Sequence, residues 1–272
     1  MRNFVFSSSI LFFTALIICS CGKNGSSSTK ESDSIYFDSI KVDTTVFLNE
    51  DTSGPRCQLA LCITYAKGKK ADYINDTLIR SGILSPDYFS ITPQKTTIEE
   101  AVKSFVSRYI NEYKRDYGDL YKADKSNANA YNCEYFVKTN VMQESTDYFA
   151  YVAEVYMYGG GAHGMSVTIV KNIDVNTGKI VSLKDIFVPG YEQRLNELII
   201  ENLCKQFDAK NISELNEKTV FMNMDVYPSE NFIIGKNGIT FVYSTDEIAY
   251  HAAGEIRVEI ENSELEDLFK KR

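Results

Sequence analysis

Apolar side chains recur at helical spacing in two long stretches and one short stretch of the chain. The first long stretch runs from Thr96 to Arg115, and its stripe consists of Ile98, Val102, Phe105, Tyr109 and Tyr113. The sequence from Thr97 to Glu100 fits a capping box at the start of this helix. The second runs from about Tyr191 to Phe207, with Leu195, Leu198, Ile199, Leu203 and Phe207 on one side. A short stretch, Asp72 to Arg80, precedes Gly82, a typical helix stop. Such stripes pack against a core, so the pattern predicts two long helices and one short helix.

Shorter apolar runs, several of them alternating with polar residues, predict β-strands elsewhere. We expect strands at residues 57–65, 131–142, 147–158, 166–174, 179–183, 232–234, 239–243 and 255–260. The Asn176-Thr177-Gly178 and Asn237-Gly238 sequences are tight-turn signals, so successive strands should run antiparallel. The polar residues 116–132 are expected to form a loop, and residues 264–269 a terminal helical turn.

The order of these elements predicts an α+β fold. We expect a mostly antiparallel sheet with two long helices packed on it, in two sequential subdomains. The first is an α+β subdomain at residues 35–157, and the second is an α+β domain at residues 158–272 that carries the GGAHG motif.

The N-terminus has the pattern of an export signal. Arg2 is its only base, and an apolar run from Phe4 to Ile18 ends in Cys19-Ser20-Cys21. We expect a signal peptide at residues 1–20, lipidation of Cys21, and a disordered polar tether at residues 21–34. The protein would then be extracytoplasmic and lipid-anchored to a bacterial membrane. The alternative is plain secretion with cleavage nearby.

Charge and cysteine content narrow the picture further. The net charge is −8, and no basic stripe is present, so we expect no nucleic-acid partner. Four cysteines follow Cys21, namely Cys57, Cys62, Cys133 and Cys204, and no pair has metal-site spacing. Cys57 and Cys62 should point to opposite faces of one strand, so a bond between them is not expected. The sequence favours no longer-range disulfide over another.

A glycine cluster around one of the two histidines is the main candidate for chemistry. Gly160, Gly161, His163 and Gly164 follow Tyr158, and would form a ligand-binding loop or a histidine-fixed strand bulge. We favour the bulge. His251 is the second candidate, beside small residues. Together with Asp174 or Glu247, the two histidines would hold a metal, but no spacing motif supports this, and we expect no metal and no cofactor.

No catalytic residue is assigned from the sequence. A Gly-x-Ser-x-Gly elbow is absent, and no cysteine lies near a histidine in the chain. A strand with four tyrosines would line a sugar or protein interface, although a buried sheet face explains most of them: Tyr148, Tyr151, Tyr156 and Tyr158. The acidic C-terminal residues read as a solvated face that would also attract a basic protein: Glu255, Glu259, Glu261, Glu264, Glu266 and Asp267.

The stretch from Tyr158 to Phe187 carries a family resemblance. Its Gly160–Gly164, Asn172–Asp174, Thr177–Lys179 and Leu183–Phe187 segments, with a later match at Gly238–Gly254, resemble a domain of unknown function. That domain occurs outside the membrane in lysozyme-sensing anti-sigma factors and accompanies some peptidoglycan deacetylases. The resemblance implies a sensing or binding domain. It departs from both families, because only three residues precede the apolar run and two histidines are too few for a deacetylase metal centre.

We therefore expect a non-enzymatic, membrane-anchored lipoprotein of the cell envelope. Its partner would be lysozyme or a peptidoglycan fragment. Two alternatives stay open: a wall-glycan hydrolase that uses His163, and a structural envelope protein that binds another protein of the same cell.

Overall fold

The structure is a computed structural model that describes residues 34–50, 52–85, 88, 95–143, 146–222 and 224–271. Its strands are β1 (Tyr36–Phe47), β2 (Arg56–Lys67), β3 (Cys133–Met142), β4 (Tyr148–Tyr158), β5 (Met165–Asp174), β6 (Ile180–Val181), β7 (Phe232–Ile234), β8 (Gly238–Tyr243) and β9 (Ile256–Glu261). Its α-helices are α1 (Ala71–Ile79), α2 (Ile98–Ala123), α3 (Leu183–Ile186), α4 (Glu192–Gln206), α5 (Ile212–Glu217) and α6 (Asn262–Leu265). The 3₁₀ helices are η1 (Ala128–Tyr131), η2 (His251–Ala253) and η3 (Glu266–Leu268).

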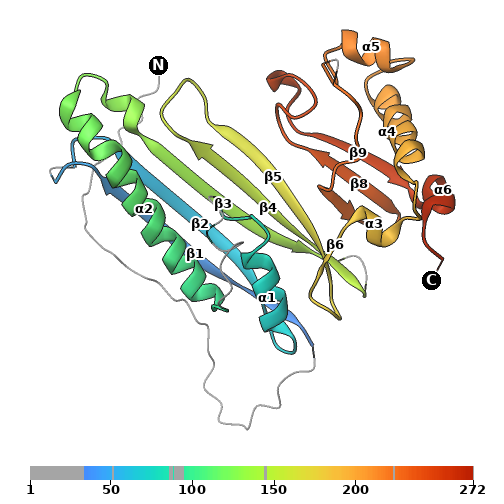
Figure 1. The fold of residues 1–272 in the computed structure, drawn as a ribbon, viewed down its shortest axis with the longest axis horizontal. Coiled ribbons are helices and arrows are strands. Elements are labelled where there is room, and N and C mark those ends of the chain that lie inside the picture. Colours follow the sequence, from blue (N-terminus) through green and yellow to red (C-terminus); the bar gives the residue numbers. More distant parts are fainter. Residues whose placement is uncertain are drawn as a thin grey trace, which may run out of the picture.

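The N-terminal unit, residues 34–181, is built on a six-stranded sheet in the order β1-β2-β3-β4-β5-β6 (Figure 1). Strands β2 and β3 are parallel, whereas the other neighbouring pairs are antiparallel. The sheet is therefore mixed. The parallel pair arises because the chain between β2 and β3 contains α1 and α2, and a crossover of this length returns it to the same end of the sheet.

Helix α2 covers one face of this sheet, and its stripe forms the first core. Ile98, Val102, Phe105 and Tyr113 are buried, which confirms the predicted stripe. The predicted capping box is also present between Thr97 and Glu100. The helix does not end near Arg115, however. It continues to Ala123 because Tyr117 and buried Tyr121 extend the spacing of four, so the first part of the expected loop at 116–132 is helix.

The C-terminal unit, residues 183–269, has its own sheet of three antiparallel strands, β7-β8-β9. Helix α4 packs on it through Leu195, Leu198, Ile199 and Leu203, in a core separate from the first. The two long helices were expected to lie on one sheet, and this expectation is wrong. Each helix covers a different sheet, because the apolar faces of β7–β9 lie against α4 rather than against α2 (Figure 1).

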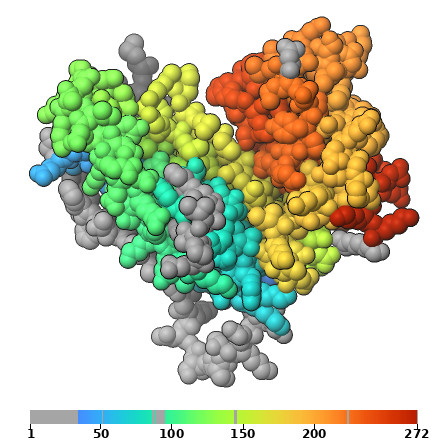
Figure 2. All heavy atoms as spheres, viewed as in Figure 1, coloured from blue at the N-terminus to red at the C-terminus, as the bar shows by residue number. Residues whose placement is uncertain are grey.

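Asparagine side chains and a small apolar cluster join the two units. Asn172 of β5 donates to the Phe232 carbonyl at 2.7 Å and accepts from the Ile234 amide at 3.1 Å. Asn231 accepts from the Val170 amide at 2.5 Å. Buried apolar residues complete the contact: Ala150, Val152, Val170, Ile233 and Val242. Figure 2 shows the units touching below and separated by a notch beside the β4–β5 segment, coloured yellow.

Several other expectations can be compared with the fold. The short helix, the hairpin around Asn237-Gly238 and the C-terminal helical turn are confirmed. Strand β1 was not predicted at all. The first sheet extends to Val181, so it crosses the boundary expected between residues 157 and 158.

The signal peptide, Cys21 and the tether up to residue 33 lie outside the described residues. In the described part of the chain, no helix is both long enough and apolar enough to span a membrane.

Candidate functional site

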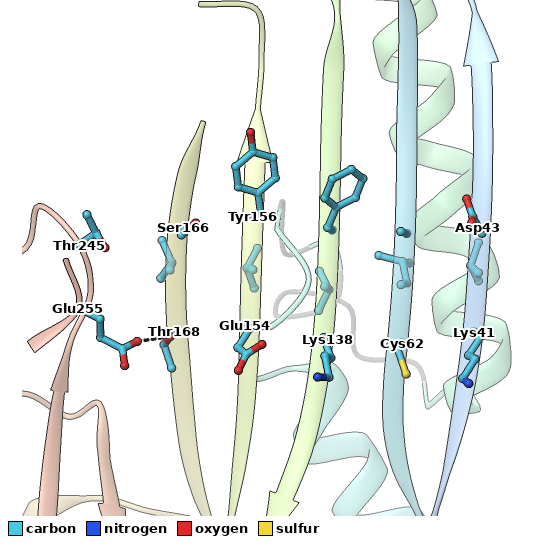
Figure 3. A pocket seen from close by; sticks show the side chains of 17 residues that line it. Lys41, Asp43, Cys62, Lys138, Glu154, Tyr156, Ser166, Thr168, Thr245 and Glu255 are labelled. Atoms are coloured by element: carbon cyan, nitrogen blue, oxygen red, sulfur yellow. Dashed lines mark hydrogen bonds between the residues drawn. The ribbon is translucent and has the colours of Figure 1, made fainter. Parts of the chain in front are cut away.

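A groove of about 1070 Å³ lies on the first sheet, and Thr245 and Glu255 of the C-terminal unit contribute to its wall. Core residues of β2 such as Leu59, Leu61 and Ile63 point toward α2, and the alternating residues face the groove. The groove is therefore the part of the sheet that neither α2 nor the C-terminal unit covers. Figure 3 shows the residues that line the groove along β1 to β5, with Thr245 and Glu255 beside β5.

One row of groove residues crosses the sheet in register and is mostly polar. Cross-strand pairing places Lys41 beside Cys62, Cys62 beside Lys138, Lys138 beside Glu154, and Glu154 beside Thr168. Figure 3 shows this row as a line that ends at Glu255, which accepts a hydrogen bond from the Thr168 hydroxyl. In the part of the chain that the structure describes, neither lysine of the row makes an ion pair. Both ammonium groups are thus available to a ligand.

A second row, adjacent to the first, carries an aromatic pair. It consists of Asp43, Ala60, Phe136, Tyr156 and Ser166, again in cross-strand register. The rings of Phe136 and Tyr156 stack with their centroids 5.6 Å apart and their planes 21° apart. Because the two rings support one another, their outward edges form a fixed apolar ridge beside the charged row.

The glycine loop, residues 159–164, positions Tyr156 at the end of the groove. Gly164 lies against the Tyr156 ring so closely that a Cβ atom would overlap it. Gly160 has a φ of +74° and packs on the Ala130 carbonyl, where a side chain would also clash. The Tyr158 hydroxyl donates to the Gly161 carbonyl at 2.9 Å. These glycines therefore shape the loop and allow close packing. They lie in the connection between β4 and β5, and not in a strand bulge as expected.

The structure brings the two histidines together. The rings of His163 and His251 lie with centroids 6.2 Å apart, both are exposed, and His251 Nδ1 lies 2.9 Å from Asp246 Oδ2. Neither ring lines the groove. The carboxylates considered for a metal site lie elsewhere: Asp174 accepts from amides of the β5–β6 turn, and Glu247 accepts from the Tyr227 hydroxyl and the Ser244 amide. No group of three or more His, Cys, Asp or Glu residues within the described ranges is arranged to hold a metal.

Among the groove residues, sequence reasoning singled out only Tyr156 and Glu255. It missed Lys41 and Asp43 because β1 was not recognised, although apolar Ile40, Val42 and Val46 alternate with polar residues there. It missed Lys138 and Glu154 for a different reason. Their strands were predicted, but the sequence does not show the register that sets Lys138 beside Glu154, nor that β2 and β5 flank this pair.

Comparisons with known proteins bear on both units. A family model described as "Protein of unknown function (DUF3298)" matches residues 184–263, and one described as "Deacetylase PdaC" matches residues 57–166. The chain is 25% identical over 178 residues to the peptidoglycan-N-acetylmuramic acid deacetylase PdaC of Bacillus subtilis strain 168. This match covers 64% of the chain but only 37% of that relative's length.

Two solved structures have a fold similar to that of this chain. A crystal structure of a DUF3298 family member from Bacteroides fragilis NCTC 9343 has a TM-score of 0.79 and 26% identity, and the match covers 89% of this chain and 96% of that one. A DUF3298 family protein from Pseudomonas aeruginosa PAO1 shares the fold, with a TM-score of 0.59 at 14% identity over 88% and 96% of the two chains. Residues 184–263 are therefore similar to the DUF3298 family, and residues 57–166 are similar to the domain named after the deacetylase PdaC.

Proposed function

We propose that this protein is a binding module of the bacterial cell envelope whose groove holds a fragment of peptidoglycan. The observation that carries the proposal is the pair of rows on the open sheet face, where two lysines that form no ion pair with any described residue lie beside the stacked Phe136 and Tyr156. The similarity to a protein named as a peptidoglycan deacetylase supports this choice of ligand. The expected export signal and lipid anchor support a place in the envelope.

The chemistry of a wall fragment matches that of the groove. Sugar rings and N-acetyl methyl groups offer apolar surface to the edges of Phe136 and Tyr156. The carboxylates of the stem peptide would lie near Lys41 and Lys138. A free amine of the peptide would lie toward Glu154. The groove volume, about 1070 Å³, is slightly above the range of typical small-molecule sites, which suits a disaccharide with its peptide.

The groove supports binding better than hydrolysis. In the described residues, no hydrogen bond joins His163 to a nucleophile or a carboxylate, and its ring is exposed outside the groove. Hydrolysis would require a positioned acid, base or nucleophile at the bound bond. We therefore keep the non-enzymatic reading, in which the groove recognises the fragment and leaves it unchanged.

Calorimetry with purified disaccharide-tetrapeptide tests the proposal. The protein would begin at residue 22, so that no lipid is attached. We expect saturable binding that falls at least tenfold in Lys138→Ala. The matched control is Lys103→Ala, which removes an exposed lysine from α2 on the covered face of the sheet. Absence of binding by the unmodified protein, or equal losses in the two variants, would overturn the proposal.

Lysozyme is a second candidate partner, favoured by the exposed row on β9. Residues of this strand alternate between buried and exposed, and Glu259 and Glu261 face solvent. Such a row would steer a basic protein. Replacing both glutamates by glutamine should then weaken lysozyme binding while leaving the binding of the wall fragment unchanged. Binding that disappears at physiological salt would indicate charge attraction alone.

A further inference from the structure

Two buried cysteines face each other across the parallel strands of the first sheet. Cys57 near the start of β2 is the register partner of Cys133 at the start of β3. Cys57 is fully buried, and Cys133 is 8% exposed. Because register partners project to the same face, both thiols lie in the core beneath α2, where the Tyr109 hydroxyl is 3.4 Å from Cys133 Sγ.

The spacing of such a pair suits a covalent bond. Neighbouring strands lie about 4.7–4.9 Å apart, and disulfides join Cα atoms that are about 4.4–6.8 Å apart. The neighbouring Cys57 thiol lowers the pKa of Cys133 to about 7, and the neighbouring Cys133 thiol together with burial raises the pKa of Cys57. Neither of the other described cysteines has this placement, since Cys62 lines the groove and Cys204 lies on α4.

We propose that Cys57 and Cys133 form a disulfide in the mature protein, made by thiol–disulfide exchange during export. The Cys133 thiolate attacks an external disulfide, such as that of a thiol oxidase protein, and one external thiol leaves. Cys57 then loses its proton and displaces the second external thiol as the Cys57–Cys133 bond forms. The two cysteines lose two electrons, and the external disulfide gains them. Because both thiols are buried in the folded protein, the thiol–disulfide exchange takes place before the core has formed.

The position of this bond explains what it would stabilise. It links the parallel strands β2 and β3. The chain segment that connects these two strands is long and contains α1 and α2. Parallel strands with a distant connection gain most from a cross-link that shortens the unfolded loop. The bond would also hold the β1–β2 hairpin, which carries Lys41 and Cys62, against the strand that carries Lys138.

Counting thiols tests the proposal. A Cys21→Ser protein would be exported to the periplasm of a bacterial host, denatured without reductant, and alkylated. We expect intact mass to show two alkylated cysteines fewer than in the reduced sample, and peptide mapping to join Cys57 to Cys133. The oxidised protein should also melt about 5–15 °C above the reduced one. Complete alkylation of the exported protein when it is denatured without reductant, or a map that joins other cysteines, would overturn the proposal.

Variants make the assignment specific. Cys57→Val should lose the cross-link, whereas a Cys62→Ser, Cys204→Ser double variant should keep it. If Cys57→Val does not fold, the double variant alone decides the question. Made together with Cys21→Ser, it retains only Cys57 and Cys133 after the signal segment. These two either both resist alkylation before reduction or both react with the alkylating reagent.

Discussion

Asn172 and Asn231 each use one amide side chain to bond to the backbone of the other unit. Asn172, on β5, bonds to the carbonyl of Phe232 and the amide of Ile234. Asn231, just before β7, accepts from the Val170 amide and donates to the Thr168 carbonyl at 2.7 Å. An amide side chain has both a hydrogen-bond donor and a hydrogen-bond acceptor. Each asparagine therefore bonds to a backbone carbonyl and a backbone amide of the other unit, as a neighbouring strand would. This junction places the C-terminal unit beside the groove.

Replacing Asn172 by alanine should strongly destabilise the protein. The change leaves a buried carbonyl and a buried amide without partners, because Asn172 is only 2% exposed. We expect a loss of about 2–4 kcal/mol in the free energy of unfolding, measured by urea denaturation. The control is Asn262→Ala, whose exposed side chain donates to the Lys236 carbonyl at 3.0 Å and should cost about 0.5 kcal/mol. Equal losses would show that the junction does not depend on Asn172.

Two neighbouring glycines should respond differently to alanine. Gly160→Ala adds a Cβ atom that meets the Ala130 carbonyl, at a φ of +74°. We expect it to cost more than about 1 kcal/mol of stability. Gly161→Ala should be nearly neutral, since no atom lies within 4 Å of its added Cβ and its φ is not positive. Thermal melts of both variants test this. Equal melting temperatures would refute the packing role assigned to Gly160.

The aromatic ridge of the groove can be tested without charge changes. Tyr156→Ala removes the ring that stacks on Phe136, and we expect binding of the disaccharide-tetrapeptide to weaken by about 5–20-fold. Tyr156→Phe keeps the ring and should bind within about threefold of the unmodified protein. The control variant is Tyr73→Ala, an exposed tyrosine on α1. Isothermal titration calorimetry measures all three, and a loss in Tyr73→Ala equal to that in Tyr156→Ala would contradict this role.

The turn into α3 should contribute stability that depends on pH. Hydrogen bonds from the Ser182 hydroxyl and amide lower the pKa of Asp185 below its ordinary value of 3.8. A lowered folded pKa means that the stabilisation is complete above the unfolded pKa and is lost as pH falls through the folded one. Asp185→Ala should therefore cost about 0.5–1 kcal/mol near pH 7, and this cost should shrink as pH falls below the unfolded pKa toward the lowered folded pKa.

Urea denaturation of Asp185→Ala between pH 7 and pH 3 measures this dependence. Asp267→Ala is the control, because Asp267 is exposed on η3. A cost of Asp185→Ala that stays constant over this range would show that ionisation of Asp185 does not contribute.

Local patterns in the chain predicted its elements well. The apolar stripe from Ile98 to Tyr113 and the capping box at Thr97 depend only on residues three or four positions apart. The sequence alone therefore predicts both. The end of α2 was less readable, because polar residues between Asp116 and Ala123 concealed the tyrosines that continue the stripe. Strand β1 was missed because its apolar side chains are only half-buried, and its sequence is therefore more polar than that of β2.

The candidate site could not be predicted in the same way. Lys41, Cys62, Lys138 and Glu154 come from four strands, and a sequence shows no contact between residues so far apart. The glycine–histidine motif drew attention to a loop, which proved to pack against Tyr156 rather than to line the groove.

The sequence by itself determined the export pattern at the N-terminus, the acidic charge, most helices and strands, and the α+β class, because each depends on composition or on short-range periodicity. Only the tertiary structure decided that α2 and α4 cover different sheets, that β2 and β3 run parallel, and that Cys57 meets Cys133. These features depend on which apolar faces pack together, and that choice is made by the whole core at once. The groove also depends on strand pairing, because its two rows of side chains form only where β1 to β5 pair in register.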